Sequence, residues 1–175
     1  AAHRGTSAGQ YSKFDFARRI MWAMVSPLFR YSPRHLYGWR NFMLRCFGAR
    51  IGQAVRIYPS ITVFAPWKLS IGDEVTIGWD VRLYNLAAIS IGARCIVSQC
   101  AHLCAGNHDC RQPHLPFTNK PIVIEDDVWI CADAFVGSGV RVGRLAVIGA
   151  RAVVTKDVPA HAVMAGNPAK QVSER

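Results

Sequence analysis

Residues 71–83 read IGDEVTIGWDVRL, and this stretch decides the fold. An aliphatic residue recurs at every sixth position, namely Ile71, Ile77 and Leu83. Four positions after an aliphatic comes a small or β-branched residue, such as Val75 or Val81. A period of six fits neither an α-helix, with 3.6 residues per turn, nor a plain strand, with a period of 2. It fits a β-solenoid with short, flat faces.

The same period extends in both directions from this stretch. Ile51-Gly52, Ile71-Gly72 and Ile91-Gly92 are twenty residues apart, whereas Ile124 and Val142 are eighteen apart. Three hexads make one triangular coil of eighteen residues, so the twenty-residue coils carry a two-residue bulge at a corner. The recurring glycines suit tight corners that need a positive φ. We therefore predict an all-β solenoid over residues 51–165, followed by a short tail over residues 166–175.

The period breaks between about residue 104 and residue 121. The break contains Asn107, His108, Asp109 and His114 together with several prolines. A coil cannot absorb so many non-periodic residues, so we expect them to leave the solenoid as a loop. Long loops inside compact repeats are usually functional. The break is therefore the first place to look for chemistry.

The first fifty residues differ from the repeats in charge and aromatic content. They hold nine Lys and Arg against Asp15 alone, a net charge of +8, whereas residues 51–175 carry a net charge of +2. We expect one or two helices over residues 14–47. The apolar run 20–29 is short of the roughly 20 residues that cross a bilayer. Two roles stay open, namely a cap over the open end of the solenoid and contact with an anionic membrane surface.

The six cysteines are best explained as free thiols. Cys95 stands at a small core position of the repeat, and no secretory signal peptide is visible. We therefore expect a reducing compartment, namely the cytoplasm, with peripheral contact at the inner face of the inner membrane as an option. The Cys and His residues of the break lack the paired spacing of a zinc site, so no metal is expected.

Three further stretches resemble the hexapeptide-repeat acyltransferases, whose family fold is a left-handed parallel β-helix. They are residues 103–109 (LCAGNHD), residues 120–130 (KPIVIEDDVWI), and residues 153–159 (VVTKDVP) with AGNPAK at 165–170. Together they are most similar to the galactoside, maltose and nodulation O-acetyltransferase branch. Within it, YGWRNF at 37–42 and PWKL at 66–69 resemble the colanic-acid-type exopolysaccharide acetyltransferases.

The resemblance implies a homotrimer that binds acetyl-CoA in the groove between neighbouring β-helices, with no metal. The acceptor would be a sugar or a lipid-linked glycan. His108 would be the general base that takes the proton of a sugar hydroxyl, a role that suits an imidazole because its pKa lies near neutral. Asp109 would orient His108, and Asn85 and His114 are candidates for acceptor binding.

The acetyl-CoA site is also implied by motif. Small residues would let the pantetheine arm approach, and cations would contact the phosphates. The matching positions are Trp129, Ala132, Ala150, Thr155, Lys156 and Lys170. Packing would explain Trp129 equally well, and each lysine could be a solvated surface charge.

Three other functions fit the sequence less well. A γ-type carbonic anhydrase shares this fold, but His102, His108 and His114 are each six residues apart, which would send them to different faces. A non-catalytic β-helix that serves as a scaffold would not need the loop histidine and the lysine motifs together. Nucleic-acid binding is suggested only by the basic isoelectric point, and the charge lies in one segment without a recognised motif.

Overall fold

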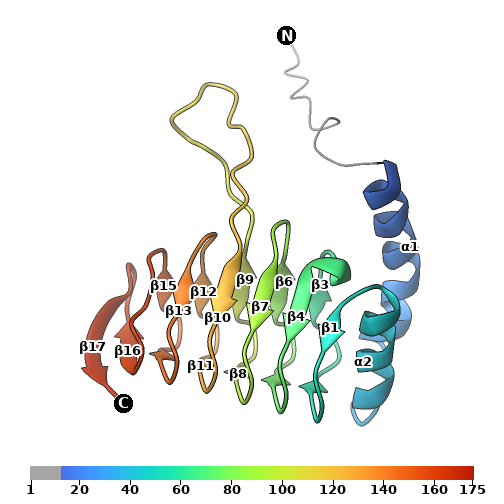
Figure 1. The fold of residues 1–175 in the computed structure, drawn as a ribbon, viewed down its shortest axis with the longest axis horizontal. Coiled ribbons are helices and arrows are strands. Elements are labelled where there is room, and N and C mark those ends of the chain that lie inside the picture. The colour runs from blue at the N-terminus through green and yellow to red at the C-terminus, as the bar shows by residue number, and fades with distance from the viewer. Residues whose placement is uncertain (1–12) are drawn as a thin grey trace.

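The computed structural model describes residues 13–175, so the first twelve residues of the predicted N-terminal extension lie outside it. Two helices precede a parallel β-solenoid whose three sheets form the sides of a triangular prism (Figure 1). The predicted all-β solenoid is confirmed. Within the described residues, neither helix is long and apolar enough to cross a bilayer.

Each of the first five coils contributes one strand to each sheet, and β16 and β17 extend one of the three sheets. Sheet A contains β1 (Arg50–Ile51), β4 (Leu69–Ile71), β7 (Ile89–Ile91), β10 (Ile122–Ile124) and β13 (Arg141–Val142). Sheet B contains β2 (Arg56–Ile57), β5 (Thr76–Ile77), β8 (Ile96–Val97), β11 (Trp129–Ile130), β14 (Val147–Ile148), β16 (Ala162–Ala165) and β17 (Lys170–Glu174). Sheet C contains β3 (Thr62–Val63), β6 (Arg82–Tyr84), β9 (His102–Cys104), β12 (Phe135–Val136) and β15 (Val153–Val154).

The core is the interior of the prism, filled by stacked aliphatic side chains. Ile71 pairs with Ile91 in sheet A, and Leu83 pairs with Leu103 in sheet C, so equivalent positions lie above one another. The small or β-branched positions of the repeat, such as Val75 and Val81, are buried as well. Ala87 stands at such a position, four residues after Leu83, but is only partly buried. Leu86 is buried in its place, because a twenty-residue coil shifts the chain at that corner.

The glycines of the repeat have a different purpose from the one predicted. Corners do need a positive φ, but non-glycine residues such as Glu74 and Arg94 adopt it there. Gly72 has no positive φ; a Cβ at that position would lie 2.7 Å from the backbone nitrogen of Ala93 in the next coil. Gly72 is therefore required because adjacent coils approach closely, and the expectation of a positive φ at these glycines was wrong.

The two helices close the first coil. Helix α2 (Tyr37–Cys46) packs on β1 and β2, and its fully buried Arg40 donates hydrogen bonds to the carbonyl oxygens of Ile57, Pro33 and Arg34 and to the hydroxyl of Ser32. Helix α1 (Lys13–Arg30) inserts Trp22, whose indole N–H donates to the carbonyl of Val63 at 2.7 Å. Both helices thus pack against the first coil.

The short C-terminal tail contains a strand. Within residues 166–175, β17 pairs antiparallel with β16 in sheet B. An antiparallel strand satisfies backbone groups of β16 that would otherwise be an open sheet edge.

Candidate active site

One edge of the prism, where the chain passes from sheet C to sheet A, carries every insertion into the regular coil. The two-residue bulges of the first two coils lie there, over residues 64–68 and 85–88. The long loop, residues 105–121, leaves the same edge between β9 and β10 and stands well out from the prism (Figure 1). The predicted extrusion of the break is confirmed.

The loop is organised as an irregular hairpin. Thr118 N–H donates to the carbonyl of Asn107 at 2.8 Å, and Asp109 N–H donates to the carbonyl of Pro116 at 2.9 Å. His108 and Phe117 form an isolated antiparallel bridge between the two arms. These hydrogen bonds lie within the loop, so its shape is set by its own residues rather than by the coils.

The imidazole of His108 is exposed and held in one orientation. Its Nδ1 lies 2.5 Å from the carbonyl oxygen of Leu115, and its ring lies against Phe117 with a centroid distance of 4.3 Å. A carbonyl oxygen only accepts hydrogen bonds, so Nδ1 must carry the proton of the neutral ring. Nε2 is then the atom with the free lone pair, which is what a general base requires.

Asp109 is adjacent to His108 in sequence but its carboxylate points into the loop tip. One oxygen accepts from Arg111 N–H at 3.0 Å, and the other accepts from the side-chain amide of Gln112 at 3.0 Å. The group found to orient the imidazole is therefore the backbone of Leu115, which we did not predict. A backbone carbonyl carries no residue-type signal in a sequence.

Ser138 forms hydrogen bonds at the base of the loop. The sequence did not predict this role. Its hydroxyl accepts from Lys120 N–H at 2.9 Å and lies 3.4 Å from the carbonyl of Ala105. One side chain of the following coil thus contacts both ends of the loop. Nothing in the repeat pattern distinguishes this serine from other corner residues.

The two candidate acceptor residues lie in different environments. Asn85 is fully buried; its amide oxygen accepts from Phe64 N–H and Ala65 N–H, and its amide nitrogen donates to the carbonyl of Ala65. These bonds hold the bulges of two successive coils together, which is a structural role. His114 is exposed near the tip of the loop.

His102 lies on the outer face of sheet C, one coil away from Arg82. It is half-buried, with its ring perpendicular to that of Phe135 at a centroid distance of 5.5 Å. Burial, with a smaller effect from the charge of Arg82, lowers the pKa of this imidazole. His102 is thus a packed neutral side chain on the face that leads to the loop.

The residues expected to bind acetyl-CoA fall on two edges of the prism. Ala132 and Ala150 occupy equivalent positions of successive coils where sheet B passes to sheet C, and Arg151 N–H donates to the carbonyl of Ala132. Thr155 and Lys156 follow β15 on the edge that carries the loop, two coils farther along, which is about 10 Å at the usual spacing of strands. All four side chains are exposed or half-exposed.

The two remaining cofactor candidates lie on sheet B. Trp129 is 46% exposed on the outer face, and its indole N–H donates to the hydroxyl of Ser98 at 3.0 Å. Lys170 is the first residue of β17 and is exposed. The outer face of sheet C thus has predicted acetyl-CoA residues on both of its edges, and Trp129 and Lys170 lie on the adjoining sheet.

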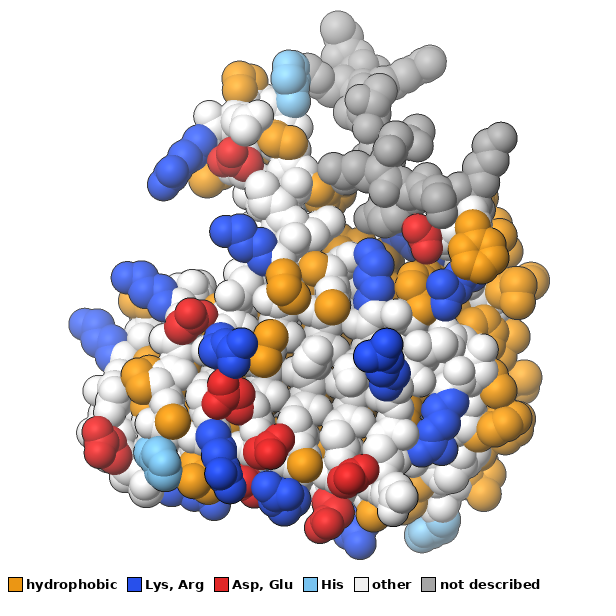
Figure 2. Space-filling model, in the orientation of Figure 1, with side chains coloured by type: hydrophobic (Ala, Val, Ile, Leu, Met, Phe, Trp, Pro, Cys, Tyr) orange, Lys and Arg blue, Asp and Glu red, His pale blue; other side chains and the backbone are white. Residues whose placement is uncertain are grey.

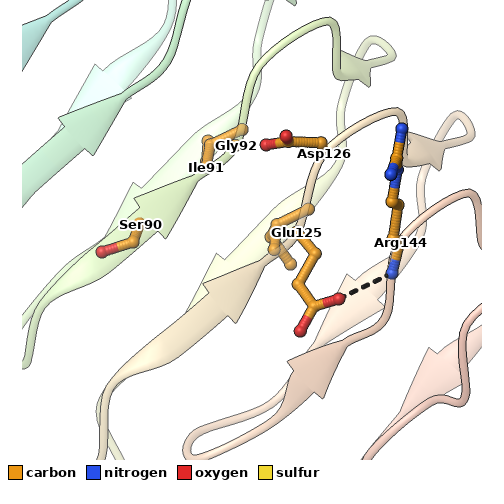
Figure 3. Close-up of a pocket in the computed structure, with 7 residues that line it drawn as sticks. Ser90, Ile91, Gly92, Glu125, Asp126 and Arg144 are labelled. Atoms are coloured by element: carbon orange, nitrogen blue, oxygen red, sulfur yellow. Dashed lines mark hydrogen bonds between the residues drawn. The ribbon is translucent and has the colours of Figure 1, made fainter.

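A hollow of about 350 Å³ on sheet A is a different kind of feature (Figure 3). Its charged side chains are already paired, because Glu125 accepts from Arg141 at 2.6 Å and from Arg144 N–H at 2.9 Å. The Arg141 guanidinium also holds the pKa of Glu125 below its usual range. The hollow is lined by a structural ion-pair cluster. It lies at the edge where the chain passes from sheet A to sheet B, whereas the loop leaves the edge between sheets C and A.

Within residues 13–175, no group of three or more His, Cys, Asp and Glu side chains is arranged to hold a metal ion. Burial raises the pKa of the Cys95 thiol to about 11, in keeping with a core position.

Comparison with known proteins agrees with this architecture. Residues 121–156 match the bacterial transferase hexapeptide family (six repeats). Over 157 residues, 90% of this chain and 86% of the relative, the sequence is 45% identical to a protein of Escherichia coli K12 named colanic acid biosynthesis acetyltransferase WcaF.

Solved structures share the fold over nearly the whole chain. A hexapeptide-repeat acetyltransferase of Vibrio cholerae superposes with a TM-score of 0.86 at 26% identity, covering 93% of each chain. The same enzyme complexed with acetyl-CoA superposes at 0.84, with 93% of this chain and 90% of that one covered. A galactoside acetyltransferase in complex with coenzyme A superposes at 0.83 with 21% identity, covering 94% and 84%, and so supports the fold alone.

Proposed function

Because the chain belongs to the family of hexapeptide-repeat acetyltransferases, we propose that it transfers the acetyl group of acetyl-CoA to a sugar hydroxyl. The acceptor is a precursor of an exopolysaccharide similar to colanic acid, carried as a sugar or a lipid-linked glycan. The name of the Escherichia coli relative supports the pathway, and the acetyl-CoA complex of the Vibrio cholerae enzyme supports the donor. No metal takes part.

His108 is the general base of this reaction. Nε2 removes the proton of the acceptor hydroxyl while the oxygen attacks the thioester carbonyl, and the carbonyl electron pair moves to oxygen. When the tetrahedral intermediate collapses, the C–S bond breaks and the thiolate of CoA takes the proton from the imidazolium. The products are an acetyl ester and CoA, and the imidazole returns to its starting state.

The single observation that carries this proposal is the Nδ1 contact of His108 with the Leu115 carbonyl. It fixes the neutral tautomer whose Nε2 accepts a proton, and it stabilises the imidazolium once the proton has been taken. Asp109 supports His108 only indirectly, by shaping the loop tip that presents Leu115.

The proposed donor and acceptor sites lie along the two edges of sheet C. Acetyl-CoA lies along small Ala132 and Ala150, with Trp129 and Thr155 beside it and Lys156 and Lys170 toward its phosphates. His114 contacts the acceptor from the loop. Asn85 shapes the bulged edge beneath the loop from its buried position rather than by touching the sugar.

A homotrimer completes the site. The loop stands away from its own prism, so His108 needs a neighbouring surface to form a closed pocket (Figure 1). In the later coils the outer faces of sheets B and C carry Trp129, Val147, Phe135 and Val153, whereas sheet A carries Ser90, Val123 and Arg141. Faces B and C are thus suited to subunit contact. The trimer is proposed to work in the cytoplasm, on an acceptor presented at the inner membrane.

The test is acetyl transfer from labelled acetyl-CoA to galactosides, maltose and lipid-linked oligosaccharides by wild type and by His108→Ala. Loss of a general base should lower the rate by about 10²–10⁴-fold. His161→Asn is a matched control, because His161 is an exposed corner histidine with a positive φ that asparagine tolerates. Near-full transfer by His108→Ala would overturn the mechanism. An absence of transfer by wild type to any acceptor would overturn the function.

A further inference from the structure

Helix α1 has more apolar surface than the solenoid uses. Trp22 and Phe29 point inward and are at most 5% exposed. A second stripe, one helical turn apart along the opposite flank, is left outside: Ile20 is 46% exposed, Met24 68% and Leu28 64%. Figure 2 shows hydrophobic side chains gathered along the edge of the molecule on which α1 lies.

Helix α2 extends this apolar face. Trp39 and Phe42 are 42% and 56% exposed, and their rings lie 6.2 Å apart. The indole N–H of Trp39 points to the carbonyl of Leu28, at 3.5 Å, so the two helices present one surface. We call Ile20, Met24, Leu28, Trp39 and Phe42 the helix face. A connected apolar surface of this kind on a folded protein marks an interaction site.

The surroundings of the helix face are strongly basic. Residues 14–50 contain seven arginines and a single acidic residue, Asp15, a net charge of +6. Arg30, Arg34 and Arg45 are all exposed. One of the seven arginines, Arg40, is buried. The rest of the chain is nearly neutral, so most of the positive charge belongs to the helical segment that carries the helix face.

We propose that the helix face binds the surface of an anionic phospholipid bilayer. Flexible Met and Leu side chains enter the boundary between headgroups and acyl chains, and the arginines attract the negative lipids. Trp39 suits this boundary, because an indole has an apolar body and one polar N–H. The helices lie on the membrane and do not cross it.

Because the helical segment is positively charged, an anionic bilayer is a better binding partner for the helix face than a second copy of this chain. A symmetric contact between two helix faces would bring together two segments of like positive charge, each with the exposed Arg30, Arg34 and Arg45, which is unfavourable. An anionic lipid surface neutralises the same charge. The loop and the first turn of α1 extend beyond the same edge of the prism (Figure 1), so a protein docked through α1 would hold the loop near the membrane. The last point rests on the proposed function, whereas the binding itself does not.

The experiment is co-sedimentation of the full chain with vesicles of phosphatidylcholine alone or mixed with phosphatidylglycerol. We expect binding to the mixed vesicles at low salt and a large loss at high salt, because screening weakens the attraction. The double variant Met24→Gln/Leu28→Gln should bind on the order of tenfold more weakly, because two apolar side chains are removed from the contact. Glutamine keeps the helix propensity.

Val172→Gln is the matched control. Val172 is 63% exposed on β17, at the other end of the solenoid. The Val172→Gln variant should therefore bind vesicles as the wild type does. Three results would each overturn the proposal: no binding of wild type to mixed vesicles, unchanged binding of the double variant, or equal binding to neutral vesicles. A fourth is a smaller assembly of the double variant in light scattering, which would assign the helix face to contact between copies. Acetyl transfer to a water-borne acceptor by the double variant separates this test from that of the enzyme activity.

Discussion

The loop 105–121 and the next coil, residues 122–139, are almost equal in length but opposite in construction. The coil bonds to its neighbours: Ile122 N–H donates to Ala88 and Trp129 N–H donates to Ala146. The loop bonds mainly to itself, through pairs such as Thr118 with Asn107. The coil is stabilised by hydrogen bonds to the coils on either side, whereas most hydrogen bonds of the loop join residues within the loop.

This difference separates the two tasks of the molecule. Coil positions are fixed by close contact above and below, so they tolerate little change. The loop contributes almost nothing to the core, so its residues can be arranged around His108 without cost to the prism. The same edge carries the bulges of the first two coils, which shows that insertions there leave the stacking intact.

The largest effect is expected where the coil is tightest. Gly72→Ala would place a Cβ 2.7 Å from the Ala93 nitrogen, and we expect a loss of about 2–3 kcal/mol in the free energy of unfolding. Gly38→Ala is the control, because no atom lies within 4 Å of the new Cβ on α2. It should stabilise the protein by about 0.5–1 kcal/mol through helix propensity. Equal effects of the two variants in denaturant unfolding would refute the close-contact explanation.

Ser138→Ala probes the junction between coil and loop. Removing the hydroxyl breaks its contacts with both ends of the loop. We expect kcat to fall by roughly tenfold, because His108 is then positioned less well against the acceptor hydroxyl. KM for acetyl-CoA should change little, because the proposed donor residues lie elsewhere. The free energy of unfolding should fall by only about 1 kcal/mol. A change confined to stability would show that Ser138 does not position the loop.

The smallest effect is expected from pH acting on His102. Its pKa is lowered in the folded protein, mainly by burial, so the unfolded chain binds its proton more readily. Stability from this group is complete above the unfolded pKa of about 6.5 and declines as the pH falls toward the lower folded value. His102→Gln should therefore flatten the unfolding free energy between neutral and mildly acidic pH. An unchanged slope would show that His102 is not the group responsible.

The sequence predicted the coils well because the repeat is a direct consequence of stacking. It identified Ile77 and Leu83 as recurring aliphatic positions, and both side chains are buried in the structure. It also identified the break as a loop. The reason for the glycines was wrong, because contact between coils cannot be seen in one hexad. Asn85 was a candidate because its coil precedes the loop, yet its side-chain amide forms hydrogen bonds to the backbone of Phe64 and Ala65. The Leu115 carbonyl and Ser138 had no signal, since their roles arise only from the folded loop.

The most direct test replaces the loop by a bulge that this prism already accepts. Residues 105–121 would be exchanged for Asn-Leu-Ala-Ala, the sequence of residues 85–88, and both kcat and the free energy of unfolding would be measured on the same protein. We predict that acetyl transfer falls to background while the unfolding free energy stays within about 1.5 kcal/mol of wild type, because each halving of a loop changes its closure free energy by only about 0.6 kcal/mol. Retained transfer, or a prism that no longer folds, would contradict the division of the molecule into a stable solenoid and a catalytic loop.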